Sequence, residues 1–216
     1  YEISLGLVGS EMCIRDRNCS CLGCEMKDRQ IASVTGWQLN TYLFHTVEAK
    51  IFLDCSGDSI LAPLSGARYR MGREARAEFD KYAAPENADK CTMGSSVLIQ
   101  ARQTDHPCPF TPPSFACCYP DDESMYLKNH DIIGTGVNFW WIELGGEDDT
   151  ILDGQYINEE LLRMAYGVWD HIKNHGDHGM ENWELEWIGF LPGKRESRRY
   201  VGDYIMTQYD VENCPV

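Results

Sequence analysis

The chain lacks a long apolar run and is poor in basic residues, and these two shortages already narrow its function. No hydrophobic stretch is long enough to span a bilayer, so we expect no membrane partner. Of the 216 residues, 34 are acidic and 19 basic, which gives a formal net charge of -15 at pH 7. Because the negative phosphates of nucleic acid repel a chain with this excess of negative charge, nucleic acid is disfavoured as a partner. The composition, 43% hydrophobic and 25% charged, is typical of a globular protein with one or two domains.

The ten cysteines lack the spacing of a disulfide framework or of a common ferredoxin motif. Cys19, Cys21 and Cys24 lie close together and could suggest a metal or iron-sulfur site, but a cluster usually needs four thiolates. Others are scattered along the chain: Cys55, Cys91, Cys108, Cys117, Cys118 and Cys214. Scattered cysteines are typical of a reducing compartment, so the sequence favours a cytoplasmic location without establishing it.

The most informative stretch covers residues 51–58 (IFLDCSGD). Its three consecutive apolar residues predict a buried strand, covered on both faces, that ends at a small acidic turn. Ser56 and Gly57 carry little side-chain bulk, so the backbone of this turn could approach a ligand such as a diphosphate. Many parallel strands end in a similar turn, and the motif alone leaves that ordinary interpretation open.

A second motif, residues 191–200 (LPGKRESRRY), places four cations and one carboxylate within six residues after a tryptophan-rich strand. Guanidinium groups can bind a substrate carboxylate bidentately, or can stabilise negative charge on the ring of a redox cofactor. The alternative is a solvated basic turn that balances the acidic surface around it.

Three segments in combination resemble the bacterial FAD-dependent oxidoreductase family, which is related to the flavin-binding subunits of heterodisulfide reductases. They are residues 54–58 (DCSGD), 66–75 (GARYRMGREA) and 193–204 (GKRESRRYVGDY), and the resemblance runs from about residue 27 to residue 212. It implies an α/β fold in which a partial, Rossmann-like FAD-binding domain is interrupted by an α+β cap, or substrate, domain. It also implies two-electron redox chemistry on an unidentified small-molecule substrate with an unknown redox partner, and it allows a 4Fe-4S cluster that these cysteines do not themselves indicate.

On this resemblance we assign candidate roles to the residues of the two motifs. Contact with FAD is expected from Asp54, Ser56, Gly57 and Asp58. The catalytic candidates are Arg198 or Arg199, facing substrate or flavin charge, with Glu196 orienting the arginines and Tyr204 as a proton donor. The phenol of Tyr204 would need tuning for that role, because the ordinary pKa of tyrosine is about 10.

The chain departs from the family at its start. Members begin with a strand, a Gly-x-Gly-x-x-Gly turn and a helix that binds the FAD diphosphate, and no such turn occurs in this sequence. Residues 134–139 (GTGVNF) lack the third glycine and run into an aromatic strand, so we exclude them as a nucleotide loop. Residues 1–17 resemble the translation of a sequencing adapter, rather than a secretory leader. We therefore expect an incomplete, inactive fragment that does not bind FAD tightly.

The expected organisation places 1–17 as an artefact, 18–72 and 191–216 in the FAD-binding domain, and 73–190 in the cap. In the first part we expect a meander over 30–55, with the buried strand at 50–55, and a short helix near 60–64 that ends by Gly66. The later elements are expected as a polar helix over 73–82, a proline-rich ordered loop over 107–120, a core helix over 157–172, and strands over 93–101, 138–144, 183–190 and 200–207.

Two other functions stay open. His171 and His175 lie one helical turn apart, with Asp177 and His178 just beyond, and could bind a divalent metal in a metal-dependent hydrolase. Alternatively, these histidines are there because the helix dipole favours cations at a helix C-terminus. A non-catalytic carbohydrate- or peptide-binding module would use the aromatic residues Trp140, Trp141 and Trp183, although tryptophans on strands are more often part of the core.

Overall fold

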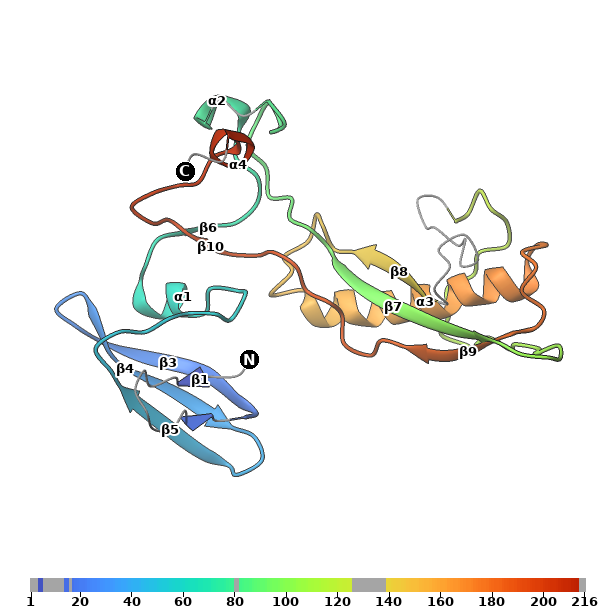
Figure 1. Cartoon of the computed structure of the whole chain (residues 1–216), viewed down its shortest axis with the longest axis horizontal. Helices are drawn as coiled ribbons and strands as arrows, with labels where there is room; N and C mark the ends of the chain where they lie inside the picture. Colours follow the sequence, from blue (N-terminus) through green and yellow to red (C-terminus); the bar gives the residue numbers. More distant parts are fainter. Residues whose placement is uncertain (1–3, 6–13, 16, 80–81, 126–138, 214–216) are drawn as a thin grey trace. The chain divides into compact units, whose positions relative to one another are not determined.

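The computed structural model describes residues 4–5, 14–15, 17–79, 82–125 and 139–213. The chain divides into two compact units (Figure 1). The first, here called the split unit, comprises Tyr1–Asp89 and Glu196–Val216, and the second, the inserted unit, comprises Lys90–Arg195. Helices and strands are mixed, consistent with the α/β class. The sequence placed the boundaries at 72/73 and 190/191, and the FAD-binding and cap roles of the two units remain predictions.

The split unit contains short elements grouped in three small sheets. A meander of β3, β4 and β5 is antiparallel throughout, β6 pairs with β10, and β1 pairs with β2. The bounds are β1 (Ser4–Leu5), β2 (Ile14–Arg15), β3 (Cys19–Lys27), β4 (Gln30–Gln38), β5 (Leu43–Glu48), α1 (Leu61–Ser65), β6 (Tyr69–Arg70), α2 (Arg76–Phe79), β10 (Arg199–Tyr200) and α4 (Gln208–Asn213).

The expected buried strand at 50–55 is absent, which corrects the sequence analysis. The meander ends with β5 at Glu48, and no described strand pairs with residues 51–55. The side chains of Ile51 and Leu53 are 77% and 80% exposed, so this apolar run is not covered on both faces. Without a hydrogen-bonded neighbour on either side, three apolar residues follow an irregular path instead of forming a strand.

The short helix expected near residue 60 is confirmed as α1. It ends at Gly66, whose φ of 75° is left-handed and is accessible to glycine without a steric cost. The strand expected over 200–207 is wrong beyond Tyr200, because the exposed chain bends at Asp203 and Tyr204, directly after Gly202, and glycine and aspartate are disfavoured in strands. The two-residue β10 that remains pairs with β6 and not with the meander.

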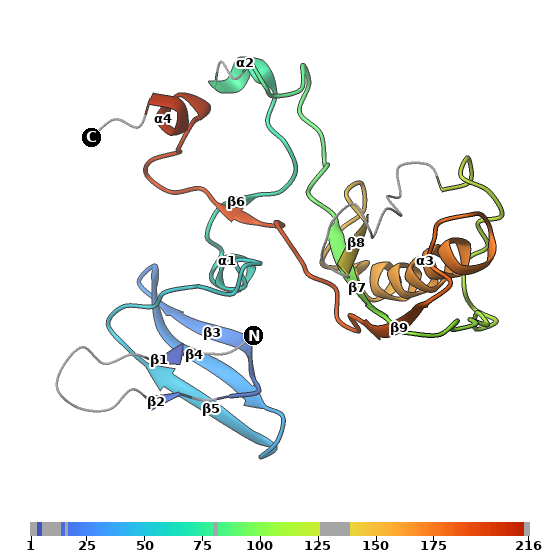
Figure 2. The same ribbon diagram turned by 45° about the vertical axis from the view of Figure 1, so that its right-hand side comes forward.

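The inserted unit packs one long helix against a three-stranded antiparallel sheet, as Figures 1 and 2 show. Its elements are β7 (Ser95–Gln103), β8 (Phe139–Leu144), α3 (Gly154–Asn174) and β9 (Trp183–Ile188), in the sheet order β8-β7-β9. Along β7 buried and more exposed positions alternate, so one face of the strand meets α3. All four elements agree with the sequence expectation within a few residues. The core is formed by Val97, Ile99, Ala101, Tyr119, Met125, Ile142, Ile157, Leu161, Ala165, Val168, Trp169, Ile172 and Met180.

The proline-rich stretch 107–120 contains no helix or strand and packs Phe110 and Tyr119 on the core, whereas Phe115 is 50% exposed. The ring of Phe110 meets Trp169 edge-to-face at 6.4 Å between centroids, and Phe115 meets Tyr166 in the same way at 5.4 Å. Trp183 is also packed against this core, which argues against its use in an exposed binding face. Residues 134–138, excluded above as a nucleotide loop, lie outside the described residues.

Candidate functional site

The two sequence motifs, far apart in the chain, lie against each other in the split unit. The Ser197 hydroxyl donates a 2.6 Å hydrogen bond to Oδ1 of Asp58, and the guanidinium Nε of Arg198 donates a 2.7 Å bond to the Asp58 carbonyl. In return, the Ser59 hydroxyl donates to the Arg198 carbonyl at 3.0 Å. Asp58, Ser59 and Ser197 are all buried. We call this set of contacts the polar seam, because it joins the acidic turn to the basic segment.

Asp54 extends the seam at the start of α1. Its carboxylate accepts hydrogen bonds from the backbone N–H groups of Ser56 (2.9 Å) and Leu61 (3.0 Å), and from the Tyr200 hydroxyl. Burial by itself would raise the pKa of Asp54, but the hydrogen bonds from Tyr200, Ser56 and Leu61 outweigh it and lower that pKa below the ordinary value. Burial, together with this hydrogen bond to Asp54, raises the pKa of Tyr200.

The two candidate arginines have different surroundings. The Arg198 guanidinium is hydrogen-bonded within the polar seam, and its carbon also lies 5.7 Å from the centroid of the Tyr69 ring. Arg199 instead donates from Nη2 to the Gly72 carbonyl (2.6 Å) and to Glu74 (2.8 Å), while its Nη1 is 3.7 Å from Glu196. Arg199 is therefore held by β6 and the residues that follow it.

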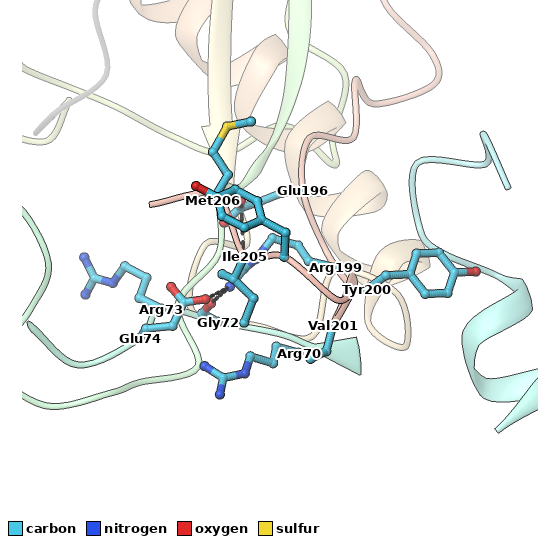
Figure 3. Close-up of a pocket in the computed structure, with 11 residues that line it drawn as sticks. Arg70, Gly72, Arg73, Glu74, Glu196, Arg199, Tyr200, Val201, Ile205 and Met206 are labelled. Atoms are coloured by element: carbon cyan, nitrogen blue, oxygen red, sulfur yellow. Dashed lines mark hydrogen bonds and ion pairs between the residues drawn. The ribbon is translucent and has the colours of Figure 1, made fainter. Parts of the chain in front are cut away.

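A cavity of about 460 Å³ lies beside Arg199, within the size range of small-molecule sites. Figure 3 shows Arg199 bonded to Glu74, with the ring of Tyr200 pointing away. Arg70 and Arg73 also line the cavity, but each forms an ion pair with a carboxylate that does not, namely Glu78 and Asp89. We call this space the Arg199 cavity, and its lining comprises Arg70, Gly72, Arg73, Glu74, Glu196, Arg199, Tyr200, Val201, Tyr204, Ile205 and Met206.

Glu196, Arg199 and Tyr204 were expected at the site from the sequence, and the structure adds Arg70, Arg73 and Glu74 to the cavity. The signal that could have found them is the segment 66–75, one of the three on which the family resemblance rested. Tyr204 is 72% exposed, and hydrogen bonding to Asp210 raises its pKa, so it is a poorer acid than an ordinary tyrosine.

A comparison with protein-family models matches residues 16–215 to FAD dependent oxidoreductases. The chain belongs to the FAD-dependent oxidoreductase family. Members of this family are oxidoreductases that use FAD, which settles the class of enzyme and its organic cofactor. Searches of curated proteins and of solved structures gave no match.

The acidic turn of this oxidoreductase does not fit the diphosphate of FAD. Gly57, at φ 81°, is open, and an added Cβ would meet nothing within 4 Å. However, the backbone N–H groups of Ser56, Ile60 and Leu61 are already bonded to the side chains of Ser56 and Asp54. The Asp54 carboxylate thus takes the place of an anion at this helix start, and a diphosphate would meet two carboxylates there. The contact of residues 54–58 with FAD stays a prediction.

The Arg199 cavity does fit the ring system of FAD. Val201, Ile205 and Met206 give it an apolar wall, while Arg199 supplies hydrogen-bond donors and Glu196 supplies acceptors. A flavin has an apolar benzenoid end and a pyrimidine end that carries both carbonyl groups and an N–H group. A mixed lining of this kind suits the pyrimidine end better than it suits a simple anion, because Glu74 and Glu196 would repel a carboxylate.

The histidines of the sequence analysis lie in the inserted unit, and the structure groups them differently. His175 bonds through Nε2 to Asp170 at 3.2 Å. His171 instead lies beside Asp122 and His178, with ring centroids 4.9 Å apart for the two histidines. The pairing of His171 with His175 on one metal, which the sequence left open as an alternative, is not the grouping found among the described residues, and Asp122 was not recognised from the sequence.

Proposed function

We propose that this FAD-dependent oxidoreductase binds the flavin ring in the Arg199 cavity of the split unit and acts there on a small-molecule substrate. FAD, when bound, supplies two-electron oxidation or reduction. Arg199 faces the pyrimidine end, where its positive charge favours the electron-rich form of the ring. The observation that carries the proposal is the lining of the cavity, which joins a guanidinium donor, carboxylate acceptors and an apolar wall.

The residues around Arg199 support this role because they fix its side chain. The Gly72 carbonyl and the Glu74 carboxylate hold Nη2, so the guanidinium is oriented before any ligand binds. Glu196 forms a looser ion pair with Nη1 at 3.7 Å, too long for a hydrogen bond, so that edge of the guanidinium can still donate to a ligand. In the proposal Glu196 orients Arg199, and Arg198 positions the segment through the polar seam and does not contact substrate.

The roles of Asp54, Ser56, Gly57 and Asp58 change within the proposal. Asp54 and Asp58 hold the basic segment through Tyr200, Ser197 and Arg198, and only the open face at Gly57 is left for contact with FAD. An iron-sulfur cluster is no part of the proposal. Burial raises the pKa of the Cys21 thiol, which disfavours the thiolate form that a cluster requires.

The proposal is tested by titrating the chain with riboflavin and with FAD and following the quenching of flavin fluorescence. Because the proposal gives the ring a site and the acidic turn offers the diphosphate few free donors, we expect the two dissociation constants to agree within about tenfold. Arg199→Gln should weaken both by about tenfold, corresponding to about 1.4 kcal/mol. Arg68→Gln, an exposed arginine outside the cavity, is the matched control and should change neither.

Two results would contradict the proposal. If FAD bound 100-fold or more tightly than riboflavin, the chain would possess a diphosphate site that the acidic turn does not provide. If Arg199→Gln left riboflavin binding unchanged, the cavity would not be the ring site, and a substrate anion would become the better candidate for this arginine. Hydrolysis by the histidine cluster is not proposed, because the family is one of oxidoreductases.

A further inference from the structure

One cluster of potential metal ligands lies in the inserted unit, outside the Arg199 cavity. Asp122, His171 and His178 each offer one ligand atom, and these three atoms lie within 4.8 Å of one another. No other group of three such residues occurs in the part of the chain that the structure describes. We propose that Asp122, His171 and His178 form a binding site for a divalent transition-metal ion, with Zn²⁺ as the best match.

The hydrogen bonds of His171 fix the nitrogen that can bind a metal. Its side chain is fully buried, and Nδ1 lies 2.8 Å from the Tyr119 carbonyl. A carbonyl oxygen can only accept, so Nδ1 carries the proton and donates it. In the neutral ring Nε2 then has the lone pair, and it is Nε2 that faces Asp122 at 3.1 Å. Zinc-binding histidines typically donate their second N–H to a carbonyl or carboxylate in this way.

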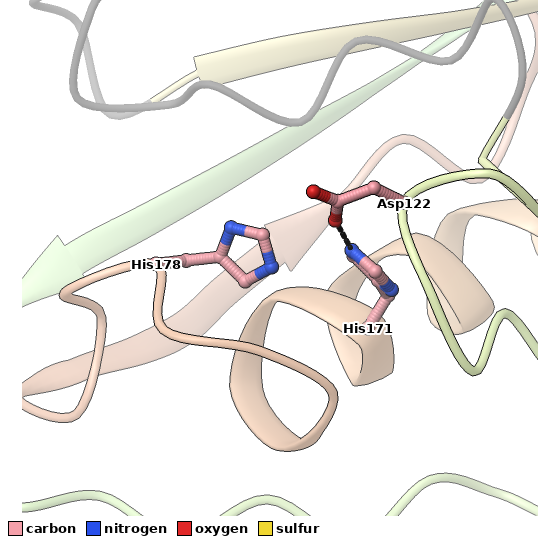
Figure 4. Close-up of side chains that lie close together, drawn as sticks. All are labelled: Asp122, His171 and His178. Atoms are coloured by element: carbon pink, nitrogen blue, oxygen red, sulfur yellow. Dashed lines mark hydrogen bonds and ion pairs between the residues drawn. The ribbon is translucent and has the colours of Figure 1, made fainter.

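The other two ligands are held on the same side of this nitrogen. Figure 4 shows Asp122 directed at His171 and a ring nitrogen of His178 turned toward the space between them. Gly176 gives the His178 ring its room, since a Cβ at this position would lie 2.7 Å from Nε2 of His178. The turn that carries Asp122 is anchored by the buried Met125, whose N–H donates to the Asp122 carbonyl at 3.2 Å.

The donor set and its environment favour zinc. Two imidazoles and one carboxylate are ligands of three-residue zinc sites, which leave a fourth position to water or another small ligand. Neighbouring ligand atoms of a tetrahedral zinc centre are about 3.3 Å apart, so the three ligand atoms, which lie within 4.8 Å of one another, need to approach by at most about 1.5 Å. The Asp122 side chain is 75% exposed, which gives the ion a route from solvent. The negative end of the α3 dipole also favours a cation in its last turns.

The competing explanation is a protonated His171 that pairs with Asp122 and binds no metal. The two explanations separate in a titration of chelator-treated protein with Zn²⁺, measured by competition with a chromophoric chelator. We expect one Zn²⁺ per chain at this site, and at least 100-fold weaker binding in both Asp122→Asn and His178→Gln, since even an outer hydrogen-bond partner contributes 10–100-fold. His171 is left intact because its replacement in the core could unfold the unit.

Matched controls use the immediate neighbours of the ligands. His175→Gln removes a histidine of the same helix that bonds Asp170, and Glu123→Gln removes an exposed carboxylate next to Asp122. Both should bind Zn²⁺ within about twofold of the original chain. Co²⁺ gives a second readout, because ligation by histidine and aspartate produces visible d–d bands without the near-ultraviolet charge transfer of thiolate ligation.

The proposal is overturned if the original chain takes up no stoichiometric Zn²⁺. It is equally overturned if Asp122→Asn and His178→Gln bind Zn²⁺ with unchanged affinity, or if Co²⁺ shows thiolate charge transfer, since the ion would then be held by cysteines. Loss of binding in His175→Gln as large as in His178→Gln would move the site back to the helical histidine pair. None of these readouts depends on flavin binding or turnover.

Discussion

The two units are stabilised by different kinds of interaction. Among the described residues, the inserted unit contains thirteen buried apolar residues in one core, most of them on α3 and its sheet. In the described part of the split unit, the buried apolar residues are Cys19, Val34, Leu61 and Ala62, while Ile51, Leu53 and many others are exposed. The split unit instead depends on the polar seam, in which the acidic turn and the basic segment bond each other directly.

This difference has a functional consequence. A unit with a large core tolerates the loss of one surface contact, whereas a unit joined by a few buried hydrogen bonds loses its geometry when one of them is removed. The Arg199 cavity is formed by the segments that the seam holds together, so its shape should be sensitive to distant polar substitutions. Replacements in the core of the inserted unit should reduce stability and leave the cavity unchanged.

The largest effect is expected from Trp169→Ala. Trp169 is fully buried in the core of the inserted unit, and its removal leaves a large cavity that should cost about 3–5 kcal/mol of unfolding free energy. Hydrogen exchange resolved along the chain should show faster exchange in β7, β8, β9 and α3, with the split unit unaffected. Leu152→Ala, at a position 83% exposed, is the control and should change stability by less than about 0.5 kcal/mol. Faster exchange in both units would mean that the comparison between them is false.

A smaller effect, confined to the other unit, is expected from Ser197→Ala. This substitution removes the hydroxyl that donates to the buried Asp58 carboxylate, at an expected cost of about 2 kcal/mol. Exchange should accelerate in α1 and in residues 196–201, and the affinity for riboflavin should fall as the cavity loosens. Ser20→Ala, in an exposed position of β3, should have no such effect. Unchanged exchange in the split unit would show that the seam does not hold its segments together.

The same contrast explains which parts of the fold the sequence could predict. The helix and strands of the inserted unit can be predicted from the periodicity of hydrophobic residues alone, and α3 and its sheet were expected nearly at their observed bounds. The end of α1 at Gly66 follows equally from local chemistry. In the split unit the apolar run 51–53 predicted a strand that does not form, because three apolar residues do not show whether another strand is available to pair with them.

Long-range partners were the least predictable part of the candidate site. The contact between the acidic turn and the basic segment was expected from the family resemblance, but its chemistry was not. Contact of Asp54 and Asp58 with FAD stays a prediction, but their hydrogen bonds with Tyr200 and Ser197 were not expected. Likewise, helical spacing suggested His175 as the companion of His171, and only the folded loop at 121–125 supplies Asp122. The spacing of residues within one helix predicts which of them are neighbours on that helix. It does not predict which loops fold onto the helix.

The smallest effect, and the finest test of the seam, is the pH dependence contributed by Asp54. Because its pKa is lower in the folded chain than the unfolded value of about 3.9, its stabilisation is present above that value and is lost as pH falls through the folded pKa. Asp54→Asn should therefore reduce stability by about 1 kcal/mol at pH 7, a typical value for a helix-start cap, and the difference should shrink below about pH 4.

The difference is measured by urea unfolding of both proteins between pH 3 and pH 7, with the exposed Asp203→Asn as control. The Asp54 carboxylate is partly exposed, so added salt should weaken its effect but not that of Ser197→Ala. If the difference in unfolding free energy between Asp54→Asn and the original chain stayed constant down to pH 3, the stabilisation would come from the hydrogen-bonding geometry of residue 54 and not from its charge. The charge of Asp54 would then have no part in holding the basic segment beside the Arg199 cavity.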